Sequence, residues 1–116
     1  MIVGIGTDLC VVSRFREMAE RRPGLLERLV NERERATSIA SQAGRFAAKE
    51  AFAKALGSPG GMRWLDSEVV KDDNGAPSFK VRGTVAARVR ELGITRVHLS
   101  LSHDGDYTTA MVVCEA

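Results

Sequence analysis

Cysteine is scarce in this sequence, and long apolar runs are missing. The two cysteines, Cys10 and Cys114, lie near opposite ends of the chain. They lack the compact spacing of a disulfide framework or a metal site, so we expect reduced, buried thiols. No apolar run approaches the ~20 residues that a membrane-spanning helix needs. No charged segment followed by an apolar stretch resembles a signal peptide, so we expect a soluble, cytoplasmic protein with no membrane partner.

An excess of one charge sign is also missing, because 17 lysines and arginines face 15 acidic residues, a formal net charge of +2. The basic residues are unevenly spread, however: seven arginines lie between Arg14 and Arg35, with five glutamates among them. Such a run is typical of a solvated helical face. It could also form a docking surface for an acidic partner. A nucleic-acid-binding module is disfavoured by the interleaved glutamates and the near-neutral total.

Internal repeats, low-complexity tracts and linkers are absent as well. We therefore expect a single domain over residues 1–116. A chain of this length builds only a modest core, so oligomerisation would help to stabilise it.

Two segments dominate the expected fold. Residues 2–9 predict a strand with Gly4 and Gly6 on one face, where another element can pack close to the backbone, and Asp8 ends that face. Residues 42–56 predict a helix that is apolar nearly all round and therefore buried, with Gly57 as its terminating residue.

Shorter elements surround these two. We expect Ser13 to cap a basic helix that ends near Pro23. Asn31 and Glu34 resemble a capping box, and Thr84 can cap a short helix. Further strands are expected over residues 65–71, 78–82, 97–103 and 107–114, with His98, Ser100 and Ser102 facing outward. The fold class is α+β, a small, mainly antiparallel sheet packed on a long buried helix.

Two carboxylates are candidates for chemistry. Glu50 lies on the buried helix, where a carboxylate is costly unless it is paired or binds a cation. It could simply pair with Lys54 one turn away, and Asp8 could simply cap a turn or helix. Alternatively, Asp8 and Glu50 share one Mg²⁺, which takes one or two protein carboxylates and gains other ligands from substrate phosphates.

Basic groups near these carboxylates would suit a phosphate-bearing substrate. Arg45, Lys49 and Lys54 lie around Glu50 on the helix, although long basic side chains usually reach solvent. His103 ends a strand beside a turn, where it either bonds to the turn backbone or contacts a phosphate or nucleophile.

At this point the sequence resembles the holo-acyl-carrier-protein synthase family, a group of phosphopantetheinyl transferases. The matching blocks are Gly-Ile-Gly-Thr-Asp-Leu at 4–9 with Arg14, Arg-Phe-Ala-Ala-Lys-Glu-Ala at 45–51 with Lys-Ala-Leu-Gly at 54–57, and Leu-Ser-Leu-Ser-His at 99–103. The turn from Asn74 to Pro77 is similar too. The chain departs from the family at Thr7, Val11 and the Val30-Asn31 pair, but no metal ligand is lost.

The resemblance implies a homotrimer with active sites between subunits. It implies Mg²⁺ on Asp8 and Glu50, transfer of 4'-phosphopantetheine from coenzyme A to a serine of an acidic acyl carrier protein, and docking of that carrier on Arg14 and Arg21. Glu50, Lys54 and His103 are the implied catalytic residues. The implied contacts with coenzyme A are Asp8, Arg45, Lys54, Gly57, Asn74, Pro77 and His103.

Several alternatives stay open from the sequence. The general base is Glu50, His103 or a water on the metal. The acceptor could be a polyketide or other secondary-metabolism carrier instead of the fatty acid carrier. An Mg²⁺-dependent phosphohydrolase could use the same carboxylates, and an inactive trimeric relative is a further rival, disfavoured because both carboxylates are present.

Overall fold

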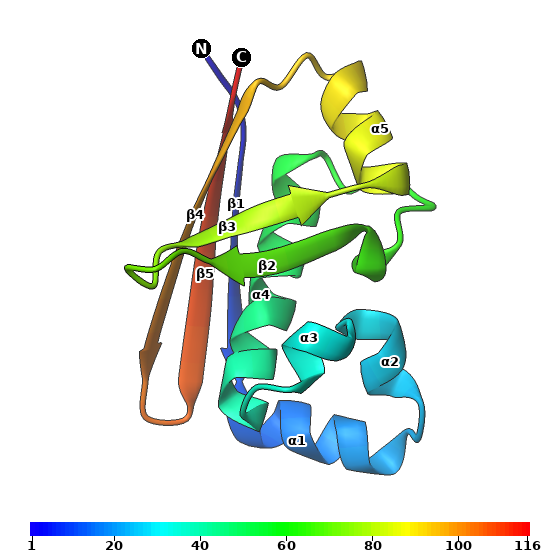
Figure 1. The fold of residues 1–116 in the computed structure, drawn as a ribbon, viewed down its shortest axis with the longest axis vertical. Helices are drawn as coiled ribbons and strands as arrows, with labels where there is room; N and C mark the ends of the chain where they lie inside the picture. Colours follow the sequence, from blue (N-terminus) through cyan, green and yellow to red (C-terminus); the bar gives the residue numbers. More distant parts are fainter.

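Three long antiparallel strands and one long helix form the centre of the molecule (Figure 1). The computed structural model describes residues 1–116. The strands β1 (Ile2–Val11), β4 (Arg96–Asp104) and β5 (Tyr107–Glu115) form a sheet of order β1-β5-β4, with β5 in the middle. Helix α4 (Ile39–Ala55) packs along one face of this sheet, against β1 and β5.

A second, two-stranded sheet crosses in front of α4 in the view of Figure 1. Its strands are β2 (Ser67–Lys71) and β3 (Pro77–Val81), preceded by the short helix η1 (Trp64–Asp66). The remaining helices lie at the two ends of α4, with α5 at one end and the other three at the opposite end. Their bounds are α1 (Val12–Arg21), α2 (Leu25–Leu29), α3 (Glu32–Arg35) and α5 (Gly83–Glu91).

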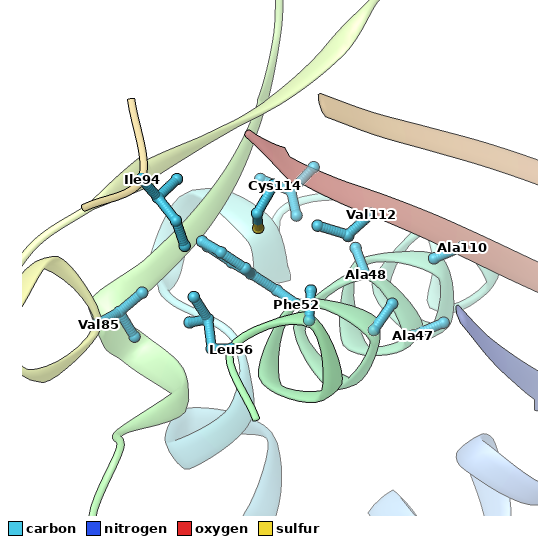
Figure 2. Close-up of a cluster of buried hydrophobic side chains, with 12 residues drawn as sticks. Ala47, Ala48, Phe52, Leu56, Val85, Ile94, Ala110, Val112 and Cys114 are labelled. Carbon is cyan, nitrogen blue, oxygen red and sulfur yellow. The ribbon is translucent and has the colours of Figure 1, made fainter. Parts of the chain in front are cut away.

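The main core forms between α4 and the strands, with Phe52 at its centre (Figure 2). Small α4 residues such as Ala48 let β5 approach, so that Val112 and Cys114 are fully buried against the helix. The Phe52 ring also lies 4.4 Å from the ring of Phe79 on β3, which fastens the second sheet to the same core. A smaller cluster around Phe15 anchors α1 to α4.

Most of the predicted elements are confirmed. The strand 97–103 shows the expected alternation, with Leu99 and Leu101 facing the core and Ser100 exposed. Asn31 and Glu34 form both bonds of the capping box. Helix α4 begins three residues earlier than predicted, because Ser38 accepts a bond from the Ser41 amide and caps it there. Both cysteines are free, and no helix is long and apolar enough to span a bilayer.

The two predicted caps at Ser13 and Thr84 are wrong. Ser13 lies inside α1, whose N-cap is Val11 without any side-chain bond. Thr84 lies inside α5, where its amide and hydroxyl both donate to Asp66 of η1, at 2.8 and 2.6 Å. In both cases a carboxylate from another element takes the place of a local cap.

Candidate active site

The glycine face of β1 lies directly on the backbone of α4. A Cβ atom on Gly4 would lie 1.9 Å from the carbonyl oxygen of Ala55, and one on Gly6 would lie 1.8 Å from that of Ala51. No larger residue fits at either position. Gly4 thus faces Ala55, and Gly6 faces Ala51 one helical turn earlier. Two residues further along β1, Asp8 comes to the preceding turn of α4, which contains Glu50.

Lys54 connects the two elements at this point. Its ammonium group donates to the Thr7 carbonyl oxygen at 2.8 Å and to the Asp8 carboxylate at 3.2 Å. The Asp8 side chain is 19% exposed and that of Lys54 is 51% exposed. The ion pair that the helical spacing suggested between Glu50 and Lys54 is therefore not formed, because β1 supplies a better placed carboxylate.

The Glu50 carboxylate is electrostatically disfavoured where it stands. Burial raises its pKa above the ordinary value, the charge of Asp8 raises it further, and Lys54 partly opposes the shift. The two carboxylates are therefore close enough to repel each other. A cation between them would remove that repulsion.

The donor set fits a hard divalent cation. The chain has no group of three or more histidine, cysteine or acidic side chains able to hold a metal ion on their own. A pair of carboxylates without a histidine or cysteine ligand suits Mg²⁺, which takes oxygen ligands and usually keeps waters or substrate phosphates in its remaining positions. Asp8 and Glu50 are the residues that can hold it.

A cavity of about 240 Å³ opens beside Glu50, between α4 and the loop that leads to β2. Its wall combines the carboxylate with apolar and aromatic side chains, so it can accept a ligand that is charged at one end and apolar along its length. The residues that line it include Glu50, Phe52, Leu56, Met62, Trp64 and Val85.

Two further predicted contact residues lie on or next to the same helix. Arg45 is on α4, and its guanidinium bonds weakly to the Ser41 carbonyl at 3.4 Å. The buried Arg45 Nε has no partner within the chain. Gly57 follows α4 with φ of +85°, as expected for a glycine that ends a helix.

The other predicted contacts are not brought to the carboxylate pair within one chain. Asn74 lies in the exposed β2–β3 turn and Pro77 begins β3. His103 is exposed on β4 opposite Thr108, which in turn pairs with Cys10 on β1. Two strand spacings, about 10 Å, separate it from β1. Its imidazole makes no hydrogen bond, so the alternative of a histidine side chain bonded to the turn backbone is wrong.

The basic residues of α1 line a shallow hollow on the surface. Arg14 and Arg21 border it together with Arg22 and Glu17. Arg21 and Glu17 pair at 3.6 Å, but both are largely exposed, so this pair contributes little to stability. The hollow keeps a net positive lining.

Sequence reasoning missed the role of Lys49. We expected this lysine near the phosphates or in solvent, but its ammonium is buried and donates to Glu34 at 2.7 Å and to the Leu29 carbonyl at 2.7 Å. The only signal was the Asn31–Glu34 capping box, which indicated a helix start but not a charge pointing inward. The pair joins α4 to α3 inside the protein.

The comparisons with known proteins agree with one another. The family model of the 4'-phosphopantetheinyl transferase superfamily matches residues 4–112. A holo-[acyl-carrier-protein] synthase from Clavibacter michiganensis subsp. michiganensis is 55% identical over 115 residues, which cover 99% of this chain and 97% of the relative.

Solved structures resemble the fold over its whole length. The holo-[acyl-carrier-protein] synthase from Neisseria meningitidis superposes with a TM-score of 0.89 at 33% identity and covers 100% of both chains. The enzyme of the same name from Helicobacter pylori, solved in complex with coenzyme A, has a TM-score of 0.84 at 29% identity, covering 96% of this chain and 99% of its own.

Proposed function

Because this chain belongs to the 4'-phosphopantetheinyl transferase superfamily, we propose that it converts apo-acyl carrier protein to the holo form with coenzyme A as donor. The observation that carries the proposal is the meeting of Asp8, Glu50 and Lys54 where β1 crosses α4. All three residues belong to the matching sequence blocks at 4–9 and 45–57. The 55% identity to a holo-[acyl-carrier-protein] synthase over nearly the whole chain supports the same activity.

The reaction is a phosphoryl transfer. The hydroxyl oxygen of the carrier serine forms a bond to the β-phosphorus of coenzyme A, and the bond from that phosphorus to the bridging oxygen breaks. Adenosine 3',5'-bisphosphate leaves with the bridging oxygen. Such a step needs positioning and charge compensation more than covalent help from the protein.

Asp8 and Glu50 are the proposed ligands of Mg²⁺. When bound, the ion would supply positive charge to the pyrophosphate oxygens. The mutual repulsion of the two carboxylates supports this assignment, since it is relieved by a cation. Asp8 would keep its orientation through the ammonium group of Lys54.

The remaining roles fall to Lys54, Glu50 and His103. Lys54 is half exposed, so its ammonium can stay bonded to Asp8 and still offer a second positive charge to a substrate phosphate. The serine proton needs an acceptor, and the carboxylate of Glu50, which lines the cavity, is one candidate from the chain. His103 is the other candidate from the chain.

Coenzyme A is proposed to bind beside the carboxylates. The cavity next to Glu50 offers an apolar wall for the non-phosphate part of the ligand. Arg45 and Gly57 lie on or directly after the same helix and are proposed contacts, with Asn74 and Pro77 of the β2–β3 turn as more distant ones. The complex of the Helicobacter pylori relative with coenzyme A supports this choice of donor.

A homotrimer is proposed because the sheet has an open apolar face. Val3, Ile5 and Leu9 of β1 point away from α4, next to Met111 and Tyr107 of β5. Of the large hydrophobic side chains exposed on this chain, all but Leu65 lie on the strands or at the start of β1. A face of this kind needs a partner. Within one chain His103 lies apart from Glu50. In such an assembly a neighbouring copy can bring its own His103 to the site.

The carrier is proposed to dock on α1. An acidic carrier is attracted by the arginine-lined hollow at Arg14 and Arg21. The names of the relatives favour an acyl carrier protein over a carrier of secondary metabolism.

Intact-mass analysis of an apo-acyl carrier protein tests the function. After incubation with this protein, coenzyme A and Mg²⁺, the carrier should gain the mass of one phosphopantetheine group, and adenosine 3',5'-bisphosphate should appear in equal amount. Consumption of coenzyme A with an unmodified carrier would instead identify a hydrolase and contradict the proposal.

A further inference from the structure

Helix α1 begins without a cap of its own. It follows β1 with no intervening loop, its N-cap Val11 has no side chain able to accept a bond, and its first turn contains no acidic residue. The first amides of a helix lack intrahelical acceptors and need partners from elsewhere. In this chain those partners come from one distant residue.

Asp106 supplies these bonds from the turn between β4 and β5. Its backbone carbonyl accepts from the Val12 amide at 2.8 Å. One carboxylate oxygen accepts from the Ser13 amide at 3.1 Å and the other from the Ser13 hydroxyl at 2.5 Å. Asp106 therefore acts as the N-cap of a helix that lies 93 residues earlier in the chain, and it places a negative charge at the positive end of that helix.

These bonds complete the attachment of α1. Val12 and Phe15 are buried and hold one side of the helix against α4. These two side chains hold α1 against α4, while Asp106 holds the first turn of α1 at the tip of the β4–β5 hairpin. The same hairpin carries His103, and the same first turn of α1 contains Arg14.

We propose that Asp106 is a positioning residue for carrier recognition: it holds the arginine face of α1 in register with the β4–β5 hairpin, so that a carrier docked on Arg14 presents its serine to the site. This inference rests on the proposed function and on docking at α1. It assigns to Asp106 no contact with the substrate or with coenzyme A.

Two substitutions with the same charge change separate the hydrogen bonds from electrostatics. Asp106→Ala removes both carboxylate bonds, whereas Asp106→Asn keeps an oxygen that can accept from the Ser13 amide, and asparagine caps helices as well as aspartate does. Charge alone predicts that both variants bind an acidic carrier more tightly, because each loses one negative charge near the docking face. If Asp106 acts by positioning α1, only the Asp106→Ala variant should bind the carrier more weakly.

Steady-state kinetics with apo-acyl carrier protein and coenzyme A provide the test. Asp106→Ala should raise the KM for the carrier about three- to ten-fold, the equilibrium factor that corresponds to the stability a helix typically loses with its cap, while the KM for coenzyme A stays unchanged. Asp106→Asn should have a KM for the carrier close to that of the wild type. Asp104→Asn is the matched control, because Asp104 lies in the same hairpin, is exposed and makes no bond to α1.

Each other outcome overturns the inference. An unchanged carrier KM in Asp106→Ala, or an equal rise in both KM values, would make the residue merely structural. Equal defects in Asp106→Ala and Asp106→Asn would remove the hydrogen bonds as the cause. A wild-type protein that never modifies the carrier would instead overturn the proposed function and this inference with it.

Discussion

Lys49 and Glu34 form an ion pair of 2.7 Å inside the protein, with each side chain only 1% exposed. Glu34 also accepts from the amides of Asn31 and Val69, and Lys49 donates to the carbonyl of Leu29. One buried pair thus joins α2, α3, α4 and β2. Burial lowers the pKa of Lys49, and the hydrogen bond to Glu34 opposes that shift.

Breaking this pair should destabilise the protein strongly. Lys49→Met leaves the Glu34 carboxylate buried and without its counter-charge, which typically costs about 3–5 kcal/mol. Urea denaturation measures the change in the free energy of unfolding. Lys71→Met is the control, because Lys71 is exposed and has no charged partner. A loss below ~1 kcal/mol, the usual size for an exposed pair, would contradict a stabilising role for the buried one.

The close approach of β1 to α4 predicts a large effect of one methyl group. In Gly6→Ala the new Cβ would lie 1.8 Å from the Ala51 carbonyl oxygen, so the strand must move away from the helix. We expect a loss of about 1–3 kcal/mol or more in stability. Transfer activity should also fall, because Asp8 moves with the strand.

Gly60→Ala is the control for that experiment, since a Cβ on Gly60 meets nothing within 4 Å and its φ is not positive. Thermal unfolding and the transfer rate should be measured on both variants. If Gly6→Ala matched Gly60→Ala in both, the account of how Asp8 reaches Glu50 would be wrong.

The cap of α5 predicts a pH-dependent contribution to stability. The hydroxyl and then the amide of Thr84 lower the pKa of Asp66 below its ordinary value of 3.8. The ionised carboxylate therefore stabilises the fold fully above that ordinary value, and this contribution is lost as the pH falls through the folded-state pKa.

Asp66→Ala should accordingly be less stable than the wild type by about 1 kcal/mol at neutral pH, as for other lost caps. The difference should shrink below pH ~4, where the carboxylate of the unfolded wild-type chain is already being protonated. Urea denaturation between pH 3 and 7 gives both values. Asp73→Asn, in an exposed turn, should show no such trend, and a constant difference for Asp66→Ala would exclude the carboxylate as its source.

Shared active sites predict complementation between inactive variants. Asp8→Ala and His103→Ala should each abolish transfer as pure trimers. After subunits exchange, a site formed by the intact Asp8 of one copy and the intact His103 of its neighbour becomes functional, which in random cyclic trimers is roughly a quarter of all sites. Recovery of transfer in the mixture supports sites between subunits, and a mixture as inactive as its parts argues for sites within one chain.

The sequence correctly predicted the elements that are specified by their own residues, without help from distant parts of the chain. The alternation of β4, the capping box at Asn31 and the buried character of α4 depend on neighbours a few residues apart, so they were visible in the sequence. The caps of α1 and α5 were not, because their acceptors are Asp106 and Asp66, which tertiary packing brings from other elements.

The candidate site was predictable to a similar extent. The glycine face and the helix pattern pointed to the meeting of Asp8 and Glu50. The partner of Lys54 could not be chosen from spacing, because helical periodicity offered Glu50 while the packing of β1 supplied Asp8. Lys49 was misjudged because an amphipathic pattern does not reveal a counter-charge that arrives from α3.

The central claim is that Asp8 and Glu50 together hold the divalent ion for transfer. The most direct measurement is the single-turnover rate of carrier modification by Asp8→Asn at saturating coenzyme A and Mg²⁺, with circular dichroism to check that the variant folds. The account predicts a folded protein whose rate falls at least about 100-fold, since charge compensation by a metal accounts for several kcal/mol of the barrier. A folded Asp8→Asn variant that transfers at the wild-type rate would contradict it.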